Sequence, residues 1–427
     1  MSASDPDHAP EAAGAKPSSG PTTLGTGVAA LALALLLGLQ PVTTDLYLPA
    51  LPLLRQDLQA SMAAVQLTMS MALLAFGVAQ LVMGPLSDRL GRRPVLLCGL
   101  ALYALSGAAA ALAPGMAGLV AARMLQGVGL AAAVVCARAM VRDLYAPHEG
   151  AQVMARGLSG LGVIALICPP LGGLLTVHGG WRAAMAALGC AGLAVLVFVA
   201  RRVPETRPAP VLGQLRPPLR RQMATIVAHP GWQAWSLLIT GTYAGLVLLL
   251  AGGSFVYLGA LGLQPGGYGL VMAGASGVYL LGTYCCRRWL RTVGLAGAVR
   301  RGSGFTLAGG LSLLGLAMSG VEQLPLILAA HWLYCFGHGI HQPCGQAGAV
   351  GPFPQAAGTA SALSGALLAG GAALAGLWLG QMLDGRLLTL AQGVAVCAVF
   401  TSTIGWTLVQ RHGERFGAAA ALPVPPR

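Results

Sequence analysis

Runs of about 20 apolar residues recur along this chain, and only short polar turns separate them. A soluble domain carries about 25% charged residues, whereas this 427-residue chain has 9% charged and 56% hydrophobic residues. A helix of such a length crosses a bilayer and satisfies its backbone hydrogen bonds internally. The sequence therefore predicts an all-α integral membrane protein.

We expect twelve transmembrane helices in two six-helix halves. The predicted spans are residues 24–46, 62–84, 94–113, 117–141, 151–176 and 181–201, followed by 232–258, 267–288, 302–320, 324–350, 357–382 and 387–410. The predicted domains are a disordered tail 1–23, an N-terminal bundle 24–201, a linker 202–231, a C-terminal bundle 232–410 and a tail 411–427. The linker is rich in proline and arginine and has no apolar run long enough to span.

Positive charge is distributed asymmetrically over the turns between these spans. Of the 25 Lys and Arg residues, 20 fall on the side of the two termini, three on the opposite side and two, Arg123 and Arg138, within a span. Cytoplasmic loops of membrane proteins carry the excess of Lys and Arg, so we expect both termini in the cytoplasm. Because the arginines lie in short membrane turns, the net charge of +13 does not indicate a nucleic-acid partner.

The most highly charged turn is Gly84–Pro94, between the second and third predicted spans. We expect Gly84 to let two helix ends approach closely. We assign a gating role to Gly84 and to five further residues of this turn: Asp88, Arg89, Gly91, Arg92 and Arg93.

A second charged segment ends the span 117–141. Arg138 and Arg142 lie four residues apart on one helical face, and Asp143 follows them. These residues either pair with Asp88 and close the cytoplasmic side, or extend to the lipid headgroups as basic side chains commonly do.

Two ionisable residues lie in the outer halves of predicted spans, where a charge is costly and indicates function. They are Asp45, in the first span, and Arg123, in the fourth. We expect them to face one cavity and to couple electrostatically, so that a proton on Asp45 weakens the interaction. The alternative is a static pair of neutralising charges. Gln126, three residues after Arg123, is expected in the same cavity, whereas Tyr47 lines either the cavity or the membrane interface.

Histidines are concentrated in the span 324–350, at positions 331, 338 and 341. His331 and His338 share a helical face, and His341 is displaced from it by about 60°. Three interpretations are open: a metal site, which the lack of a nearby carboxylate disfavours, a cavity histidine that binds substrate or protons, or packed core histidines. We place His338, with Tyr243 and Tyr257, in the substrate cavity and predict neither a metal nor a cofactor.

The span 151–176 contains Cys168-Pro-Pro-Leu-Gly-Gly173. Pro169 and Pro170 are expected to kink the helix, and Gly172 and Gly173 permit close packing. The segment either has a functional role or is only a tightly packed structural helix.

Several of these motifs resemble the major facilitator superfamily. Gly84–Pro94 is similar to that family's signature between helices 2 and 3. The Pro170, Gly172 and Gly173 pattern is similar to the helix-5 motif of its antiporters, with Pro169 where glycine is usual. Together with segments 45–52, 123–129, 138–145 and 204–206, these motifs resemble the bicyclomycin and chloramphenicol resistance (Bcr/CflA) branch, more sharply in the first half of the chain than in the second.

The resemblance implies a multi-pass transporter of the bacterial inner membrane that exports drugs or other small organic molecules by proton antiport and alternating access. It assigns proton coupling to Asp45 and Arg123, and gating to the loop that holds Asp88. The alternatives are a dedicated exporter of a native metabolite, such as a nucleoside, sugar or amino-acid derivative, and a non-transporting receptor. We expect a monomer with no enzymatic activity, whose partners are the substrate, protons and the lipid bilayer.

Overall fold

The structure, a computed structural model, describes residues 25–145, 147–207 and 219–413. The predicted tail 1–23, the end of the tail 411–427 and part of the predicted linker lie outside the described residues. Within the described ranges, every regular element is a helix. The helices follow in the order α1 (Thr26–Asp45), η1 (Leu48–Ala50), α2 (Leu51–Asp57), α3 (Met62–Leu90), α4 (Arg92–Ala111), α5 (Met116–Leu144), α6 (Pro147–Arg202), α7 (Leu219–Val227), α8 (Pro230–Val247), η2 (Leu248–Gly252), α9 (Gly253–Phe255), η3 (Val256–Ala260), α10 (Pro265–Met318), α11 (Leu324–Val350), η4 (Pro354–Ala356), α12 (Ala357–Met382), α13 (Leu387–Trp406) and α14 (Leu408–His412).

Nine helical segments of the described chain are long and apolar enough to cross a membrane. Two of them are double, because α6 is interrupted at Gly180, with φ of 65°, and α10 at Gly294, with φ of 70°. Glycine adopts this left-handed conformation without a steric penalty, so each helix reverses there and crosses again. With α11 as a further helix of 27 residues, the chain has the twelve crossings that the sequence predicts.

The predicted turn Gly84–Pro94 is mostly helical. Helix α3 continues through Gly84 to Leu90, and α4 begins at Arg92, so that Gly91 alone separates the two helices. Gly91 has φ of 101°, a value that favours glycine. A single residue therefore makes the reversal for which the sequence suggested a longer loop.

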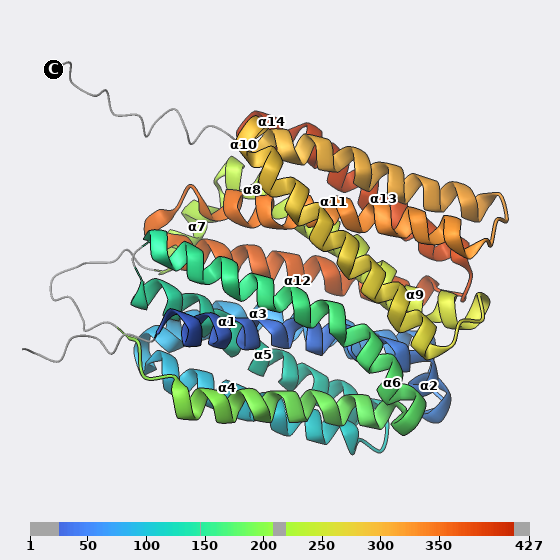
Figure 1. The fold of residues 1–427 in the computed structure, drawn as a ribbon, viewed down its shortest axis with the longest axis horizontal. Coiled ribbons are helices and arrows are strands. Elements are labelled where there is room, and N and C mark those ends of the chain that lie inside the picture. The colour runs from blue at the N-terminus through green and yellow to red at the C-terminus, as the bar shows by residue number, and fades with distance from the viewer. Residues whose placement is uncertain (1–24, 146, 208–218, 414–427) are drawn as a thin grey trace, which may run out of the picture.

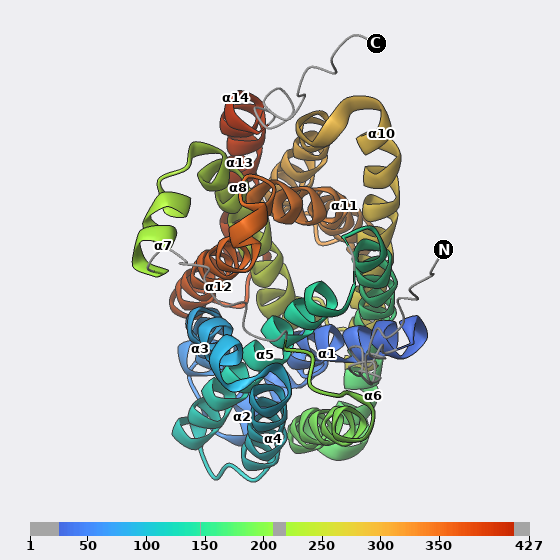
Figure 2. The same ribbon diagram turned by 90° about the vertical axis from the view of Figure 1, so that its left-hand side faces the viewer.

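The helices run side by side along one axis, with α7 and α14 at one end and α2 and α9 at the other (Figure 1). We call the first end the Arg92 end and the second the Pro265 end, after a residue that each contains. Viewed from the Arg92 end, helices α1 to α6 form one half and α8 to α13 the other (Figure 2). Helix α3 packs on α12, and α6 packs on α10, so two helix pairs join the halves.

Glycines bring the backbones of the two halves into contact at the Pro265 end. A Cβ on Gly173 of α6 would lie 2.6 Å from the Pro265 carbonyl oxygen, and one on Gly269 of α10 would lie 2.7 Å from the Pro169 carbonyl oxygen. Within the first half, a Cβ on Gly172 would overlap the Leu46 carbonyl. Small residues promote membrane-helix association because they let backbones approach closely. The predicted close packing of this segment is therefore present, and part of it joins the two halves.

Pro169 contributes to the same interface indirectly, because it leaves a backbone carbonyl of α6 free to accept a hydrogen bond from the other half. Proline has no N–H, so the carbonyl four residues before it, that of Ala165, loses its helical donor. The Ser276 hydroxyl of α10 donates to this carbonyl at 3.3 Å. The carbonyl freed within α6 thus becomes an acceptor for the opposite half.

We expect Gly173→Ala to destabilise the protein by about 1–3 kcal/mol, because the added methyl group forces the α6 and α10 backbones apart. The measurement is thermal unfolding of the purified chain in detergent. The matched control is Gly267→Ala, at which a Cβ meets no atom within 4 Å and helix propensity favours alanine. Equal melting temperatures for the two variants would contradict the assigned contact.

Candidate functional site

Arg123 is fully buried in α5 and lies against the end of α1. Its Nη2 donates to the Thr43 carbonyl at 2.8 Å, and its Nη1 donates to Gln126 Oε1. The Thr43 carbonyl is among the last four of α1, which lack helical partners. A cation is favourable at a helix C-terminus, and the Tyr47 ring, 4.4 Å from the guanidinium, adds a cation–π contact. These partners explain how α5 holds a buried charge without a carboxylate.

Asp45, the last residue of α1, is half-buried and accepts a hydrogen bond of 2.6 Å from the Thr44 hydroxyl. Among the described residues, no Lys, Arg or His lies within ion-pair distance of it. Asp45 and Arg123 thus form no direct ion pair in this conformation. The carboxylate instead lies within electrostatic reach of the Tyr243 and Tyr268 hydroxyls of the other half.

Tyr47 and Gln126 occupy the same buried layer as Arg123. Both side chains are fully buried, which excludes the interfacial position that the sequence left open for Tyr47. The Tyr47 hydroxyl lies 3.4 Å from Thr68 Oγ1 of α3. These residues therefore fix the Arg123 side chain at the centre of the first half.

The second half presents a buried wall of aromatic and histidine side chains. The Tyr257 hydroxyl lies 2.9 Å from His331 Nδ1, and Thr242 Oγ1 lies 3.1 Å from His338 Nδ1. The His338 ring lies between Tyr243 and Tyr279, with ring centroids 6.2 and 5.5 Å away. All three predicted cavity residues of this half are thus buried within one connected group.

The membrane-spanning segment Pro230–Ala260, which contains α8, η2, α9 and η3, helps to position this wall. After α8 the backbone adopts π-helical turns in η2 and η3, the second of which carries Tyr257. A π turn rotates the residues that follow it and is frequent at functional sites. The sequence analysis missed this feature, and the glycines at 252 and 253 are the only local signal for it.

His341 faces away from this wall. Its ring nitrogens lie 3.4 Å from the hydroxyls of Ser303 and Thr306 on the second arm of α10. In the described part of the chain, no group of three His, Cys, Asp or Glu side chains is arranged to hold a metal ion. His341 is thus packed against the hydroxyl groups of the second arm of α10.

A cavity of about 550 Å³, lined by both polar and apolar residues, opens at the Pro265 end between the halves. Arg55 and Gln59 line it from the first half, and Asp384 and Arg386 from the second. The sequence analysis did not select these residues, because they are ordinary polar residues outside the predicted spans until the fold brings the two halves together.

The charged group at the Arg92 end is centred on Arg92 itself. Its Nη1 pairs with Asp88 of α3, and its Nε donates to Asp143 of α5 at 2.8 Å. The side chains of Arg92 and Asp143 are 6% and 7% exposed, so this pair is shielded from water. Arg92 thus ties together α3, α4 and α5.

Of the two alternatives left open for Arg138 and Arg142, the structure does not show pairing with Asp88, which pairs with Arg92. Arg138 Nη1 instead donates at 2.9 Å to the Ser361 hydroxyl of the other half, and Arg142 lies beside Gly358. Gly84 is not a point of close helix approach either, since a Cβ there would meet no atom within 4 Å.

Glu205, to which the sequence analysis gave no role, completes the group. Its carboxylate accepts from the backbone N–H groups of Arg92 and Arg93, at 2.9 and 3.0 Å, and thus caps α4. A Cβ on Gly91 would lie 2.7 Å from Glu205 Oε2, so the carboxylate fits only against glycine. Arg93 and Arg207 add hydrogen bonds to the Ala200 and Arg89 carbonyls. The segment after α6 is therefore fastened to the start of α4.

We expect Arg92→Gln to destabilise the protein by about 3–5 kcal/mol, because it leaves the Asp143 carboxylate buried without its partner. The matched control is Arg89→Gln, since Arg89 is exposed and a surface substitution changes stability by about 0.5 kcal/mol or less. Thermal unfolding in detergent measures both. Losses of similar size would show that Arg92 acts only as one more surface charge.

We expect Glu205→Gln to lower stability by about 1 kcal/mol at neutral pH, as loss of a helix cap does. Partial burial raises the pKa of Glu205, but the four backbone N–H groups of Arg207, Arg92, Arg93 and Thr206 outweigh this effect and hold the pKa below its ordinary value of 4.5.

A depressed pKa means that the stabilisation is present above the ordinary value and is lost as the pH falls through the folded-state value. The difference in melting temperature between the native chain and Glu205→Gln should therefore vanish on acidification below that range. Glu322→Gln, at an exposed loop residue, is the control. A difference that persists in acid would argue against capping by the carboxylate.

Comparison with known proteins identifies relatives of this chain. Residues 33–377 match the family model of the Major Facilitator Superfamily. Multidrug resistance protein D of Escherichia coli (strain K12) is 32% identical over 351 residues, which cover 79% of this chain and 84% of the relative. A chloramphenicol resistance protein of Pseudomonas aeruginosa is 30% identical over 321 residues, 75% of each chain.

Solved structures show the same fold. A D-xylose–proton symporter superposes with a TM-score of 0.72 at 18% identity, covering 90% of this chain and 97% of the symporter. A bacterial homologue of the human lysosomal transporter Spinster, in an inward-facing and occupied conformation, gives a TM-score of 0.71 at 14% identity, covering 90% of this chain and 96% of that protein. With its twelve-helix fold and these relatives, the chain is a multi-pass transporter rather than an enzyme, and it belongs to the major facilitator superfamily.

Proposed function

We propose that this chain exports small organic molecules, drugs among them, in exchange for protons, as an antiporter of the Bcr/CflA type. The names of its relatives, which refer to multidrug and chloramphenicol resistance, support the class of substrate. The aromatic wall around His338 supports it as well, because aromatic faces suit flat or cationic organic molecules.

The observation that carries the proton coupling is the environment of Asp45. This carboxylate lies half-buried at the end of a membrane span with a hydroxyl, but no cation of the described chain, beside it. An unpaired charge at such a position is costly, and a proton removes the cost. Asp45 ends α1 two residues after the Thr43 carbonyl that Arg123 binds, and its charge also reaches Tyr243 of the other half. We assign Asp45 as the proton carrier and Arg123 as the residue that responds to it through the Thr43 carbonyl.

Alternating access fits the different contacts at the two ends. At the Pro265 end the halves touch through backbone atoms, as at Gly173 and Gly269. At the Arg92 end, side chains such as Arg138 and Ser361 make the contact. At interfaces, side chains commonly change rotamer while the backbone moves little, so side-chain contacts are exchanged more easily than backbone contacts. The Arg92 group is therefore assigned to gating, and substrate enters from this end.

We further propose an orientation in the bacterial inner membrane with both termini and the linker 202–231 in the cytoplasm. The excess of Lys and Arg on that side supports it. The boundaries 24–201 and 232–410 for the two bundles belong to this proposal, as does a monomeric state.

The test uses inverted inner-membrane vesicles with an acid interior and a pH-sensitive dye. Amphenicols, bicyclic peptides, fluoroquinolones, lipophilic cations and nucleosides are added in turn. We expect at least one compound to release protons from vesicles with the native chain and none to do so with Asp45→Asn. Glu322→Gln, at an exposed loop acid that does not line the cavity at the Pro265 end, is the matched control and should behave like the native chain.

A second measurement follows exchange of the active compound across the membrane of vesicles without a proton gradient. It distinguishes a variant that has lost proton coupling from one that has failed to fold. Asp45→Asn should retain this exchange, because binding and the movement of the halves remain. Proton release that survives Asp45→Asn would remove the assigned role of Asp45. No release with any compound, although nucleosides or other metabolites exchange, would indicate a narrow metabolite exporter.

A further inference from the structure

A cluster of exposed arginines surrounds the reversal of α10 at the Arg92 end. Its members are Arg287, Arg288, Arg291, Arg300 and Arg301. Helix α10 contains no Asp or Glu in its 54 residues, and none of the five arginines forms an ion pair with any described residue. The cluster is therefore a site of concentrated positive charge without an internal counter-ion.

Aromatic side chains connect this charge to the apolar surface. The guanidinium of Arg288 lies 5.2 Å from the centre of the Tyr284 ring, and that of Arg301 lies 5.3 Å from Trp289. Trp289 stacks on Phe305 with ring centroids 6.4 Å apart. Tyrosine and tryptophan prefer the level of the lipid headgroups, so the arginines lie where headgroup phosphates are found.

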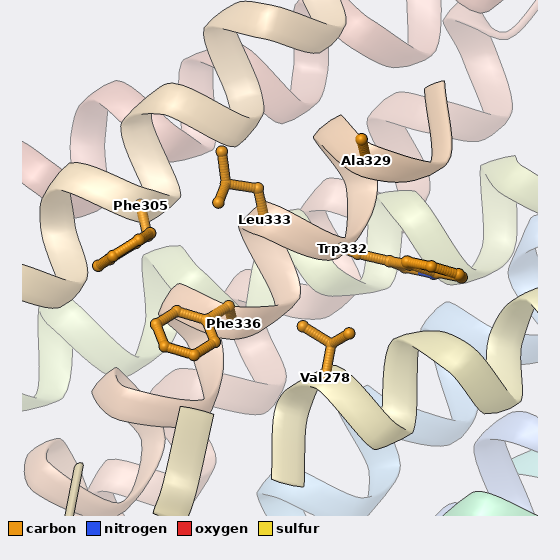
Figure 3. A pocket seen from close by; sticks show the side chains of 6 residues that line it. All are labelled: Val278, Phe305, Ala329, Trp332, Leu333 and Phe336. Carbon is orange, nitrogen blue, oxygen red and sulfur yellow. The ribbon is translucent and has the colours of Figure 1, made fainter. Parts of the chain in front are cut away.

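Phe305 also lines an apolar groove of about 270 Å³ between the two arms of α10 and helix α11 (Figure 3). The other lining residues are Val278, Ala329, Trp332, Leu333 and Phe336. Phe305 and Ala329 are exposed, so the groove opens at the surface. A groove that is lined by apolar and aromatic side chains and lies within membrane-spanning helices suits a hydrocarbon chain.

We propose that this groove and the arginine cluster together bind one anionic phospholipid of the bilayer. One acyl chain lies in the groove along Phe305 and Trp332, and the headgroup phosphate contacts Arg288 and Arg301. Guanidinium groups bind phosphate oxygens in a bidentate manner, and basic pockets between transmembrane helices bind anionic headgroups. Arg301 contacts Trp289, and Trp289 stacks on Phe305 in the groove. One lipid can therefore place its phosphate at the arginines and an acyl chain in the groove.

The experiment measures lipid retention on the purified full-length chain by native mass spectrometry. Phosphatidylglycerol and phosphatidylcholine with identical acyl chains are compared, and thermal unfolding with each lipid is measured in parallel. We expect preferential retention of one phosphatidylglycerol and a raised melting temperature. Arg288→Gln/Arg301→Gln should weaken this binding roughly 30-fold, the loss expected for two interfacial arginines. Arg201→Gln/Arg202→Gln, at exposed arginines that end α6, is the matched control and should bind normally.

A second variant tests the groove. Ala329→Trp fills it with an indole and should reduce phosphatidylglycerol binding while the melting temperature without lipid stays unchanged. Equal retention of phosphatidylcholine, normal binding by Ala329→Trp, or equal stabilisation by free glycerol phosphate would each overturn the proposal. A loss in the Arg201 and Arg202 control equal to that in the Arg288 and Arg301 variant would do so too, because it would show general charge attraction.

Discussion

The association of the two halves depends on backbone contacts that glycine permits. Lipid tails are as apolar as leucine side chains, so no hydrophobic effect drives helices together within a bilayer, and close packing has to do so. Gly173 and Gly269 supply it at the Pro265 end, and Gly77 supplies it further along, where a Cβ would lie 2.5 Å from the Ala369 methyl group. These contacts join two bundles that otherwise pack separately, through the helix pairs α3–α12 and α6–α10.

The few charges inside this framework are each stabilised in a different way. Arg123 uses the end of α1, Arg92 uses two acids, and Glu205 uses the backbone N–H groups that begin α4. Asp45 is the exception, since no Lys, Arg or His of the described residues forms an ion pair with it and its hydrogen bond comes from the Thr44 hydroxyl. A carboxylate that the fold leaves without a cation is the one whose charge a proton most readily removes, and this contrast underlies the proposed coupling.

The sequence was sufficient for the number of crossings and for drawing attention to Asp45, Arg92 and Arg123, because apolar segment length and the rarity of charge near the membrane indicate both. It was insufficient for the partners of those residues. Helical spacing placed Arg138 and Arg142 on one face. It could not show that Asp88 would pair with Arg92 or that Arg138 would donate a hydrogen bond to Ser361. Glu205 and Ser276 escaped attention for the same reason, since each acts on an atom more than 100 positions away in the chain.

The sequence by itself determined that the chain crosses a membrane twelve times, where it reverses and which side carries the positive charge. These properties follow from the local balance of apolar, charged and glycine residues. Only the tertiary structure decided that Arg123 lies against a helix end, that Tyr257 stands on a π turn and that arginines adjoin an apolar groove on α10. These are distances between helices, and helix packing fixes them through atoms that no local pattern records.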